Sequence, residues 1–409
     1  MPTFRDLFES MPADTRDLIK TVWESIPAGD RDALQKMVSS FPSEANLMRM
    51  LISMSVVEFK MTFGRKERVA ILGPANVGKS TLYNRIIQHK SDRAVVSPIP
   101  GTTRSNQQAD AGLFTVVDTP GADSVGEVGE NEKLIAFRAA QDADFLVIVF
   151  DAIQGIKRTE LDLFQELRGS DKPYIVVMNK VDLVRKDTKT IIERAAASLA
   201  IKPEQVLPVS AKEGQNVEKV MVAIAATEPQ MIAALGKALP AYRWALAWRS
   251  IVSAASVSAA IALAPLPFID FAPLIVTQSI MVLGIARIYD YQITLNRAKE
   301  LVATFGVGLL GRTLFQELSK FGGLPGWLLS AAIAAGTTVA MGYAAVTWFE
   351  RGERISSEQM RLIVQRVSLT LLDSLKHMGR KRPDRKTLQE EITQALSQSG
   401  LVEKNSSNE

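Results

Sequence analysis

The spacing of apolar residues changes along the chain, and each change marks a region with its own predicted structure. Between residues 66 and 230, short apolar runs alternate with stretches in which apolar residues recur at helical spacing. Short, nearly continuous apolar runs are typical of strands buried on both faces of a parallel sheet. This region is therefore predicted to be an α/β domain with a mostly parallel sheet and helices on both faces.

Residues 1–65 are predicted to form a helical module. Prolines recur at Pro12, Pro27 and Pro42, a strict spacing of 15 residues, and apolar residues such as Leu18 and Val22 lie at helical spacing between them. Each proline suits the first turn of a helix. We expect short helices stacked as a small bundle, which either packs on the rest of the protein or serves as a regulatory or partner-docking module.

Two long apolar runs dominate residues 231–350. Residues 250–286 contain a single charge, Asp270, and residues 321–349 contain none. Both runs exceed the length of about 20 residues that a membrane-spanning helix needs. They predict a hydrophobic all-α domain embedded in a membrane, and the alternative is a soluble helical bundle buried on itself.

Prolines divide the first run into arms at 250–264 and 274–286. At about 1.5 Å per residue, each arm reaches only about 20 Å, whereas the hydrocarbon core is about 30 Å thick. We therefore expect a hairpin that dips into the bilayer, preceded by an interfacial anchor that includes Trp244 and Trp248. The second run is long enough to span, but a second re-entrant segment is favoured because it keeps the basic tail cytoplasmic.

The end of the chain is polar again. An apolar stripe that includes Met360, Val364 and Val367 predicts a helix at 355–378, so residues 351–400 are expected to form amphipathic and basic helices. A basic cluster between Lys376 and Lys386 is either a solvated helix end or a contact with anionic lipid or RNA. Residues 401–409 are expected to be a disordered tail.

The sequence GPANVGKS, from Gly73 to Ser80, lies between a predicted strand and a predicted helix and fits a phosphate-binding P-loop. Gly73 and Gly78 let backbone N–H groups turn toward phosphate oxygens. Lys79 supplies a positive charge for the β- and γ-phosphates, and Ser80 offers a hydroxyl to Mg²⁺. The residues predicted to bind nucleotide here are Gly73, Asn76, Val77, Gly78, Lys79, Ser80 and Thr81.

Two later motifs predict that the base is guanine. Asp182 can accept two hydrogen bonds from guanine, whereas adenine would leave the carboxylate unpaired at a cost of about 1–3 kcal/mol or more. Asn179 is expected to tether loops, Lys180 to cover the base with its stem, and the Ala211 N–H to reach the guanine O6. The residues predicted to form this part of the site are Asn179, Lys180, Asp182, Ser210, Ala211 and Lys212.

The remaining motifs predict the Mg²⁺ site and the groups that act in hydrolysis. Asp118 ends a predicted strand and is expected to hold Mg²⁺ through water, while the Gly121 N–H senses the γ-phosphate. Thr103 is expected to close over Mg²⁺ as part of a first switch. The predicted metal residues are thus Ser80, Thr103 and Asp118, and hydrolysis is assigned to Lys79, Thr103 and Gly121.

These motifs occur in the order and at the spacing of a GTPase. The PGTTR sequence and the Asn of the P-loop resemble the Era-like branch (TrmE, Era and Der type), which includes tRNA-modification and ribosome-assembly GTPases. The resemblance covers about residues 67–227. It implies GTP and GDP as ligands, Mg²⁺ as cofactor and hydrolysis of GTP to GDP and phosphate.

The Era-like resemblance also bears on how water is activated. Ras-type enzymes place a Gln just after the DxxG motif, but here that position is Ala122, which cannot orient water. Asn76 occupies the position that helps bind a K⁺ ion in some Era-like relatives, and the alternative is that it only braces the loop. Arg104 is expected to touch a phosphate edge or solvent rather than act as an arginine finger.

Residues 246–350 resemble a hydrophobic helical domain of unknown role that follows Era-like GTPase domains in some bacterial proteins. The segments that carry this resemblance are 264–270, 285–290 and 335–342. It implies attachment to the bacterial inner or plasma membrane, with the GTPase domain facing the cytoplasm. A cytoplasmic location is the alternative.

Composition narrows the remaining possibilities. A chain of 409 residues implies about two or three domains. Because it has no cysteine, disulfides, thiolate zinc sites and cysteine nucleophiles are excluded. A net charge of +4 is too mild to imply nucleic acid, so nucleic acid is not expected as a partner.

The sequence therefore predicts a membrane-associated GTPase switch. Its expected partners are membrane lipid and either another protein or a second copy of the chain. One alternative is a GTP-regulated transporter or channel, as a resemblance to ferrous-iron transporter GTPases allows, but clear spans and polar residues to line a path are few. The other is an RNA or ribosome-assembly factor, although no RNA-binding signature follows the GTPase motifs.

Overall fold

The computed structural model describes residues 68–87, 112–119, 127–262, 272–291 and 326–375, and single positions between 387 and 395. The predicted N-terminal module and the predicted tail lie outside these residues, as do Thr103, Arg104, Gly121, Ala122, Asp270 and the basic cluster. The chain divides into two compact units. One comprises Arg65–Arg243, and the other comprises Met1–Gly64 together with Trp244–Glu409.

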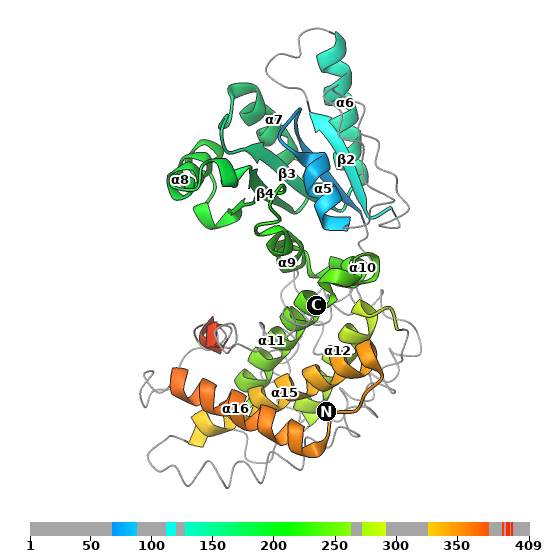
Figure 1. Cartoon of the computed structure of the whole chain (residues 1–409), viewed down its shortest axis with the longest axis vertical. Coiled ribbons are helices and arrows are strands. Elements are labelled where there is room, and N and C mark those ends of the chain that lie inside the picture. The colour runs from blue at the N-terminus through cyan, green and yellow to red at the C-terminus, as the bar shows by residue number, and fades with distance from the viewer. Residues whose placement is uncertain are drawn as a thin grey trace, which may run out of the picture. The chain divides into compact units, whose positions relative to one another are not determined.

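A five-stranded parallel sheet in the order β2-β1-β3-β4-β5 forms the centre of the first unit (Figure 1). Its strands are β1 (Val69–Pro74), β2 (Phe114–Thr119), β3 (Phe145–Asp151), β4 (Tyr174–Asn179) and β5 (Val206–Pro208). Every residue of β1 and β3 is buried, which explains why these strands are continuous apolar runs. The predicted α/β class is confirmed.

Helices cover both faces of this sheet. They are α5 (Lys79–Ile87), α6 (Glu127–Asp142), α7 (Arg158–Arg168), α8 (Thr188–Leu199) and α9 (Val217–Thr227). The unit also contains short 3-10 turns and one short helix. These are η1 (Val181–Leu183), η2 (Pro203–Gln205), η3 (Pro229–Met231), α10 (Ile232–Ala238) and η4 (Pro240–Tyr242). Helix α5 contacts α9, and the Tyr83 and Phe114 rings meet edge to face at 6.4 Å.

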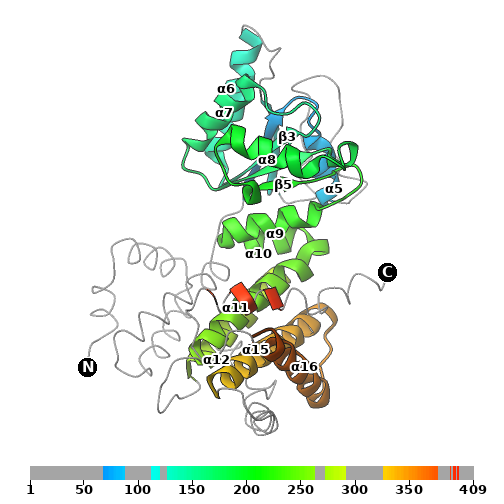
Figure 2. The same cartoon turned by 90° about the vertical axis from the view of Figure 1, so that its left-hand side faces the viewer.

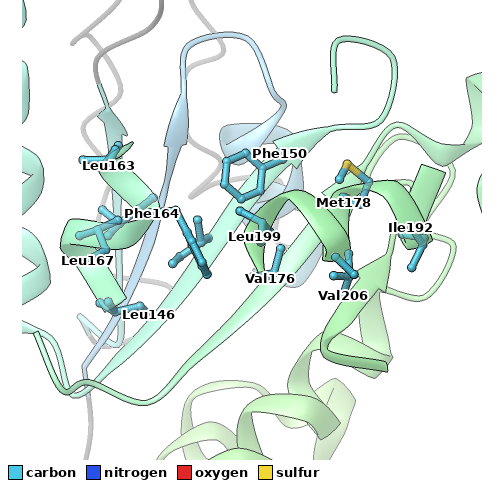
Figure 3. Close-up of a cluster of buried hydrophobic side chains, with 14 of the residues drawn as sticks. Leu146, Phe150, Leu163, Phe164, Leu167, Val176, Met178, Ile192, Leu199 and Val206 are labelled. Atoms are coloured by element: carbon cyan, nitrogen blue, oxygen red, sulfur yellow. The ribbon is translucent and has the colours of Figure 1, made fainter. Parts of the chain in front are cut away.

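The other face of the sheet carries a hydrophobic core shared with α6, α7 and α8. Figure 3 shows Leu146, Phe150 and Val176 of the sheet gathered with side chains of α7 and α8. Phe164 of α7 is 1% exposed and meets the ring of Tyr174 edge to face at 5.6 Å. Burial on both faces holds the sheet rigid and fixes the edge at which all five strands end.

Four long helices make up the described part of the second unit. They are α11 (Arg243–Ala262, which begins at the last residue of the first unit), α12 (Ala272–Ile288), α15 (Gly326–Arg351) and α16 (Ser357–Leu375). Helix α15 packs against α12 and α16, and Figures 1 and 2 show these helices side by side. A Cβ on Gly336 would lie 2.5 Å from Ser368 Oγ of α16, so a glycine permits this close approach.

The first apolar run differs from the prediction in the length of its first arm. Helix α11 begins at Arg243 and has 20 residues, which corresponds to about 30 Å rather than about 20 Å. Trp244 and Trp248 lie within this helix with their rings stacked 5.9 Å apart, and Trp248 is buried. The expected anchor is therefore part of the arm, and the argument that the arm is too short to span does not hold.

Residues 326–351 form a single unbroken helix of 26 residues, about 39 Å long. This part of the second run does not turn back, contrary to the expected re-entrant segment. The predicted stripe on the following helix is confirmed, because Met360, Val364 and Val367 of α16 are all buried.

Among the described residues, two helices are long and apolar enough to cross a membrane, Pro240–Ala262 and Gly326–Arg351. Of their most apolar windows, 72% and 89% respectively are buried inside the protein. A core helix of a soluble protein has the same length and composition, so these helices by themselves are weak evidence for a membrane.

Candidate nucleotide-binding site

The P-loop connects β1 to α5 and contains two residues with unusual backbone conformations. Asn76 and Gly78 have positive φ angles of 63° and 93°. A Cβ on Gly78 would collide with Nδ2 of Asn179, and one on Gly73 would collide with the Val149 carbonyl oxygen. The loop therefore runs too close to β3 and to Asn179 for side chains at either glycine.

Lys79 is buried at the start of α5. Its Nζ donates to the carbonyl oxygens of Gly73 (2.7 Å) and Pro74 (2.5 Å) and forms an ion pair with Asp118 Oδ1 at 2.5 Å. Because Gly73 and Asp118 are in register in β1 and β2, the lysine reaches both strands. The predicted phosphate-binding cation and the predicted Mg²⁺ acid are thus direct neighbours.

Ser80 and Thr81 follow Lys79 in the first turn of α5. Their backbone N–H groups belong to a helix N-terminus, which favours an anion such as phosphate. A Mg²⁺ ion here would be held by the Ser80 hydroxyl, by Asp118 through water and by phosphate oxygens of the nucleotide, since this ion is usually held by few protein groups together with substrate phosphates. The donors present in the described part of the site fit that cation.

Asn179 is the buried connection between the P-loop and the base-binding loops. Its Nδ2 donates to the Val77 carbonyl oxygen (2.8 Å), and its Oδ1 accepts from the Ala211 N–H (2.9 Å). The structure thus places Asn179 as the expected tether. It also shows that the Ala211 N–H, expected to reach the guanine O6, is occupied by Asn179, so a contact with O6 requires this bond to be shared or released.

Lys180 is held by a partner that the sequence analysis missed. Its Nζ lies 2.6 Å from the Asn76 carbonyl oxygen and 2.6 Å from Asp151 Oδ2. Asp151 ends β3, is buried, and accepts a further bond from the Ile153 N–H (2.8 Å). One feature of the sequence could have indicated Asp151. It is an acid at the carboxyl end of an apolar run, and it lies beside Asn179 at the end of the neighbouring strand.

Asp182 lies in η1, and its Oδ1 is buried with no hydrogen-bond partner among the described residues. A buried polar atom left without a donor costs about 1–3 kcal/mol, and more when it is charged. The atom is satisfied if a ligand brings N–H groups to it. Guanine carries two such donors on one edge, so the carboxylate fits the base that the sequence predicted.

A small cavity lies behind the P-loop. It measures about 10 Å³ and is lined in part by Gly73, Thr119 and Glu160. Burial raises the pKa of Glu160, although a hydrogen bond from the Lys157 backbone N–H opposes this shift. The cavity has room for about one water molecule, so it belongs to the packing behind the loop and not to the nucleotide site.

Two families match separate parts of the chain. Residues 68–180 match the family described as 50S ribosome-binding GTPase, and residues 244–376 match a domain of unknown function, DUF697. GTPase Der of Clostridium botulinum (strain Loch Maree) is 34% identical over 165 residues, which cover 37% of this chain and 37% of that protein. GTPase Der of Clostridium perfringens (strain SM101) is 34% identical over 166 residues, covering 38% and 37%. The chain thus spans well under half the length of these relatives.

Similar solved structures include Era in complex with MgGDPNP and a segment of 16S ribosomal RNA. It is 24% identical with a TM-score of 0.33 and covers 47% of this chain and 67% of that one. The NFeoB protein of S. thermophilus bound to GDP is 16% identical with a TM-score of 0.29, covering 82% and 98%. These likenesses are too low to carry a functional argument. They lend no support to the expectation that nucleic acid is not a partner, which stays a prediction.

Proposed function

We propose that the chain binds GTP with Mg²⁺, hydrolyses it to GDP and phosphate, and acts as a molecular switch at a membrane. The proposal is supported by the match of residues 68–180 to a GTPase family, by the similarity to GTPase Der, and by the match of residues 244–376 to DUF697. One observation carries the choice of nucleotide. It is the buried Asp182 Oδ1, which has no hydrogen-bond partner in the part of the chain that the structure describes, in the loop next to the Asn179 tether.

Separate residues of the site are proposed to bind the phosphates and the base. Lys79 and the N-terminus of α5 would hold the phosphates, and Asp118, which here pairs with Lys79, would hold Mg²⁺ through water. A bound Mg²⁺ ion would supply positive charge beside the transferred phosphoryl group. Thr103 and Gly121, which lie outside the described residues, are proposed to close over the cation and the γ-phosphate.

The proposal is tested by phosphate release from GTP and from ATP by the purified full chain, with Mg²⁺ and with EDTA. We expect release from GTP that requires Mg²⁺, and much weaker binding of ATP because adenine cannot satisfy Asp182. Equal affinity for the two nucleotides would contradict the proposed specificity.

We further propose that K⁺ stimulates hydrolysis through Asn76. With Ala122 unable to orient water, turnover in Na⁺ is expected to be slow, and replacing Na⁺ by K⁺ should raise it severalfold. Asn76→Gly is the informative variant, because glycine keeps the left-handed backbone (φ 63°) and removes only the side chain. It should abolish the difference between the two salts. Identical rates for the unchanged chain in both salts would leave Asn76 with a bracing role only.

Attachment to a membrane is proposed for the DUF697 domain, with the GTPase domain in the cytoplasm where GTP is available. Helices α11 and α15 support it by length and composition. Full-length protein should stay in the membrane pellet after carbonate washing, whereas a chain truncated after Arg243, the last residue of the first unit, should be soluble. Recovery of the full-length protein as a soluble monomer without detergent would instead favour the buried bundle.

The proposed partners of this switch are membrane lipid and either another protein or a second copy of the chain. The described residues hold no feature that favours the transporter or the ribosome-assembly alternative over this proposal.

A further inference from the structure

Arg185 joins the two loops that form the proposed guanine site. Its Nε donates to the Asp182 carbonyl oxygen at 3.2 Å, and its Nη2 lies 2.6 and 2.8 Å from the two carboxylate oxygens of Glu213. Asp182 is the residue proposed to read guanine, and Glu213 directly follows Lys212 of the second loop. One guanidinium therefore holds the backbone of the first loop and a side chain of the second.

Arg85 also contacts the second loop. Its Nη2 donates to the Glu213 carbonyl oxygen at 3.0 Å. The guanidinium lies against Gly214, where a Cβ would come within 2.5 Å of Nη2. Arg85 belongs to α5, the helix that begins with Lys79, so this contact connects the base-binding loop to the phosphate-binding helix.

The second loop is a turn closed by hydrogen bonds, so a displacement of Glu213 also moves Ala211. The Glu213 N–H donates to Ser210 Oγ (3.1 Å), and the Gly214 N–H donates to the Ser210 carbonyl oxygen (2.8 Å). The Ser210 N–H donates to the Gln215 carbonyl oxygen at 3.1 Å, which closes the turn. Displacing Glu213 must therefore shift Ser210 and its neighbour Ala211.

Beside these contacts lies an open pocket of about 550 Å³. The residues that line it are Val181, Arg185, Thr188, Glu213, Gly214 and Gln215. On this side the two loops border solvent-accessible space and not apolar packing. The contacts of the two arginines there add to the bonds that join the loops elsewhere, from the Val181 N–H to the Val209 carbonyl oxygen (3.2 Å) and from the Ala211 N–H to Asn179 Oδ1 (2.9 Å).

We propose that Arg185 and Arg85, both acting through Glu213, are positioning residues that keep the two loops closed on guanine and set the rate at which GDP leaves. The inference rests on the proposed function. Neither arginine touches the nucleotide in this role. Arg185 fixes the backbone of Asp182 relative to the second loop, and Arg85 fixes the second loop relative to α5.

The effect should appear in nucleotide release and not in fold stability. Arg185 and Glu213 side chains are 67% and 44% exposed, and exposed ion pairs contribute little to folding because solvent and salt screen them. A nucleotide can leave when the loops separate only slightly, so weakening the ties accelerates release without unfolding the domain.

The test compares Arg185→Ala, Arg185→Lys and Arg85→Ala with the unchanged full chain. Arg194→Ala, an exposed arginine on α8, is the matched control. Release of fluorescent GDP should be about fivefold faster in both alanine variants, with an unchanged melting temperature. Arg185→Lys should recover part of the effect, because lysine can pair with Glu213 but lacks the fork that also reaches Asp182.

A second readout separates positioning from general loosening. Inosine diphosphate lacks the 2-amino group that Asp182 is proposed to bind, so the ratio of GDP to inosine diphosphate affinity reports where Asp182 lies. That ratio should fall in Arg185→Ala and stay constant in Arg194→Ala. Unchanged release and an unchanged ratio in Arg185→Ala would overturn this inference alone, whereas failure of the unchanged chain to bind GDP would overturn the proposed function and the inference with it.

Discussion

Replacing Lys79 by alanine is expected to reduce affinity for GTP and GDP by about a hundredfold or more. The ammonium group is buried and ends between Gly73, Pro74 and Asp118, where the phosphates of a nucleotide would lie. Hydrogen bonds to a charged group contribute about 1.5–3 kcal/mol each, and the loss of even one strong bond or two weaker ones amounts to about two orders of magnitude.

Titration of the full-length variant with a fluorescent GDP analogue measures this loss. Lys219→Ala, an exposed lysine on α9, is the control for a changed net charge. A melting curve establishes that the variant is folded. Affinity within a few-fold of the unchanged chain would show that Lys79 does not contact the phosphates, and the site would need a different cation.

The sheet and the order of the site loops were predictable because each motif directly follows an apolar run. A parallel strand buried on both faces leaves a clear apolar signal, and the residues after it must lie at the carboxyl edge of the sheet. Asp118 after β2 and Asn179 at the end of β4 follow this rule. The close contact of Gly78 with Asn179 then follows from two loops that meet at one edge.

The contacts between loops were not predictable, since they depend on how the loops fold in three dimensions. Asp151 and Lys180 are 29 residues apart, and Arg85 and Glu213 are 128 apart. Spacing in the sequence gives no information on either pair. The same holds for the Ala211 N–H, which any of several acceptors in this crowded site can take and which Asn179 takes.

In the apolar half, the errors came from treating charge as the boundary of a helix. The predicted first arm begins at residue 250, directly after the charged Arg249. Arginine is compatible with a helix, however, and α11 begins at Arg243. The second run was expected to turn back in order to keep a basic tail cytoplasmic. That reasoning concerns the location of the tail, whereas the helix itself is decided by local propensity and by the packing of residues such as Gly336 against α16.

Changing Asp182 to asparagine is expected to shift the binding preference from GTP to xanthosine triphosphate. The buried Oδ1 of Asp182 has no hydrogen-bond partner among the described residues and is proposed to accept from guanine. An amide at this position offers a donor where guanine also has a donor, so GTP should bind about a hundredfold more weakly or worse. Xanthosine triphosphate carries a carbonyl at the same ring position and accepts from the amide, so its affinity should rise.

Direct titration of each protein with fluorescent analogues of GTP and of xanthosine triphosphate gives both affinities, and hydrolysis of xanthosine triphosphate by the variant shows that the phosphate site is intact. Asp187→Asn provides the matched control, because Asp187 is exposed at the start of α8 and makes no side-chain cap. A reversal of preference in the first variant alone assigns base recognition to Asp182. An amide that only disturbs η1 would weaken the binding of GTP and of xanthosine triphosphate alike. Parallel loss of both nucleotides would therefore mean that the carboxylate supports the loop and that another group recognises guanine.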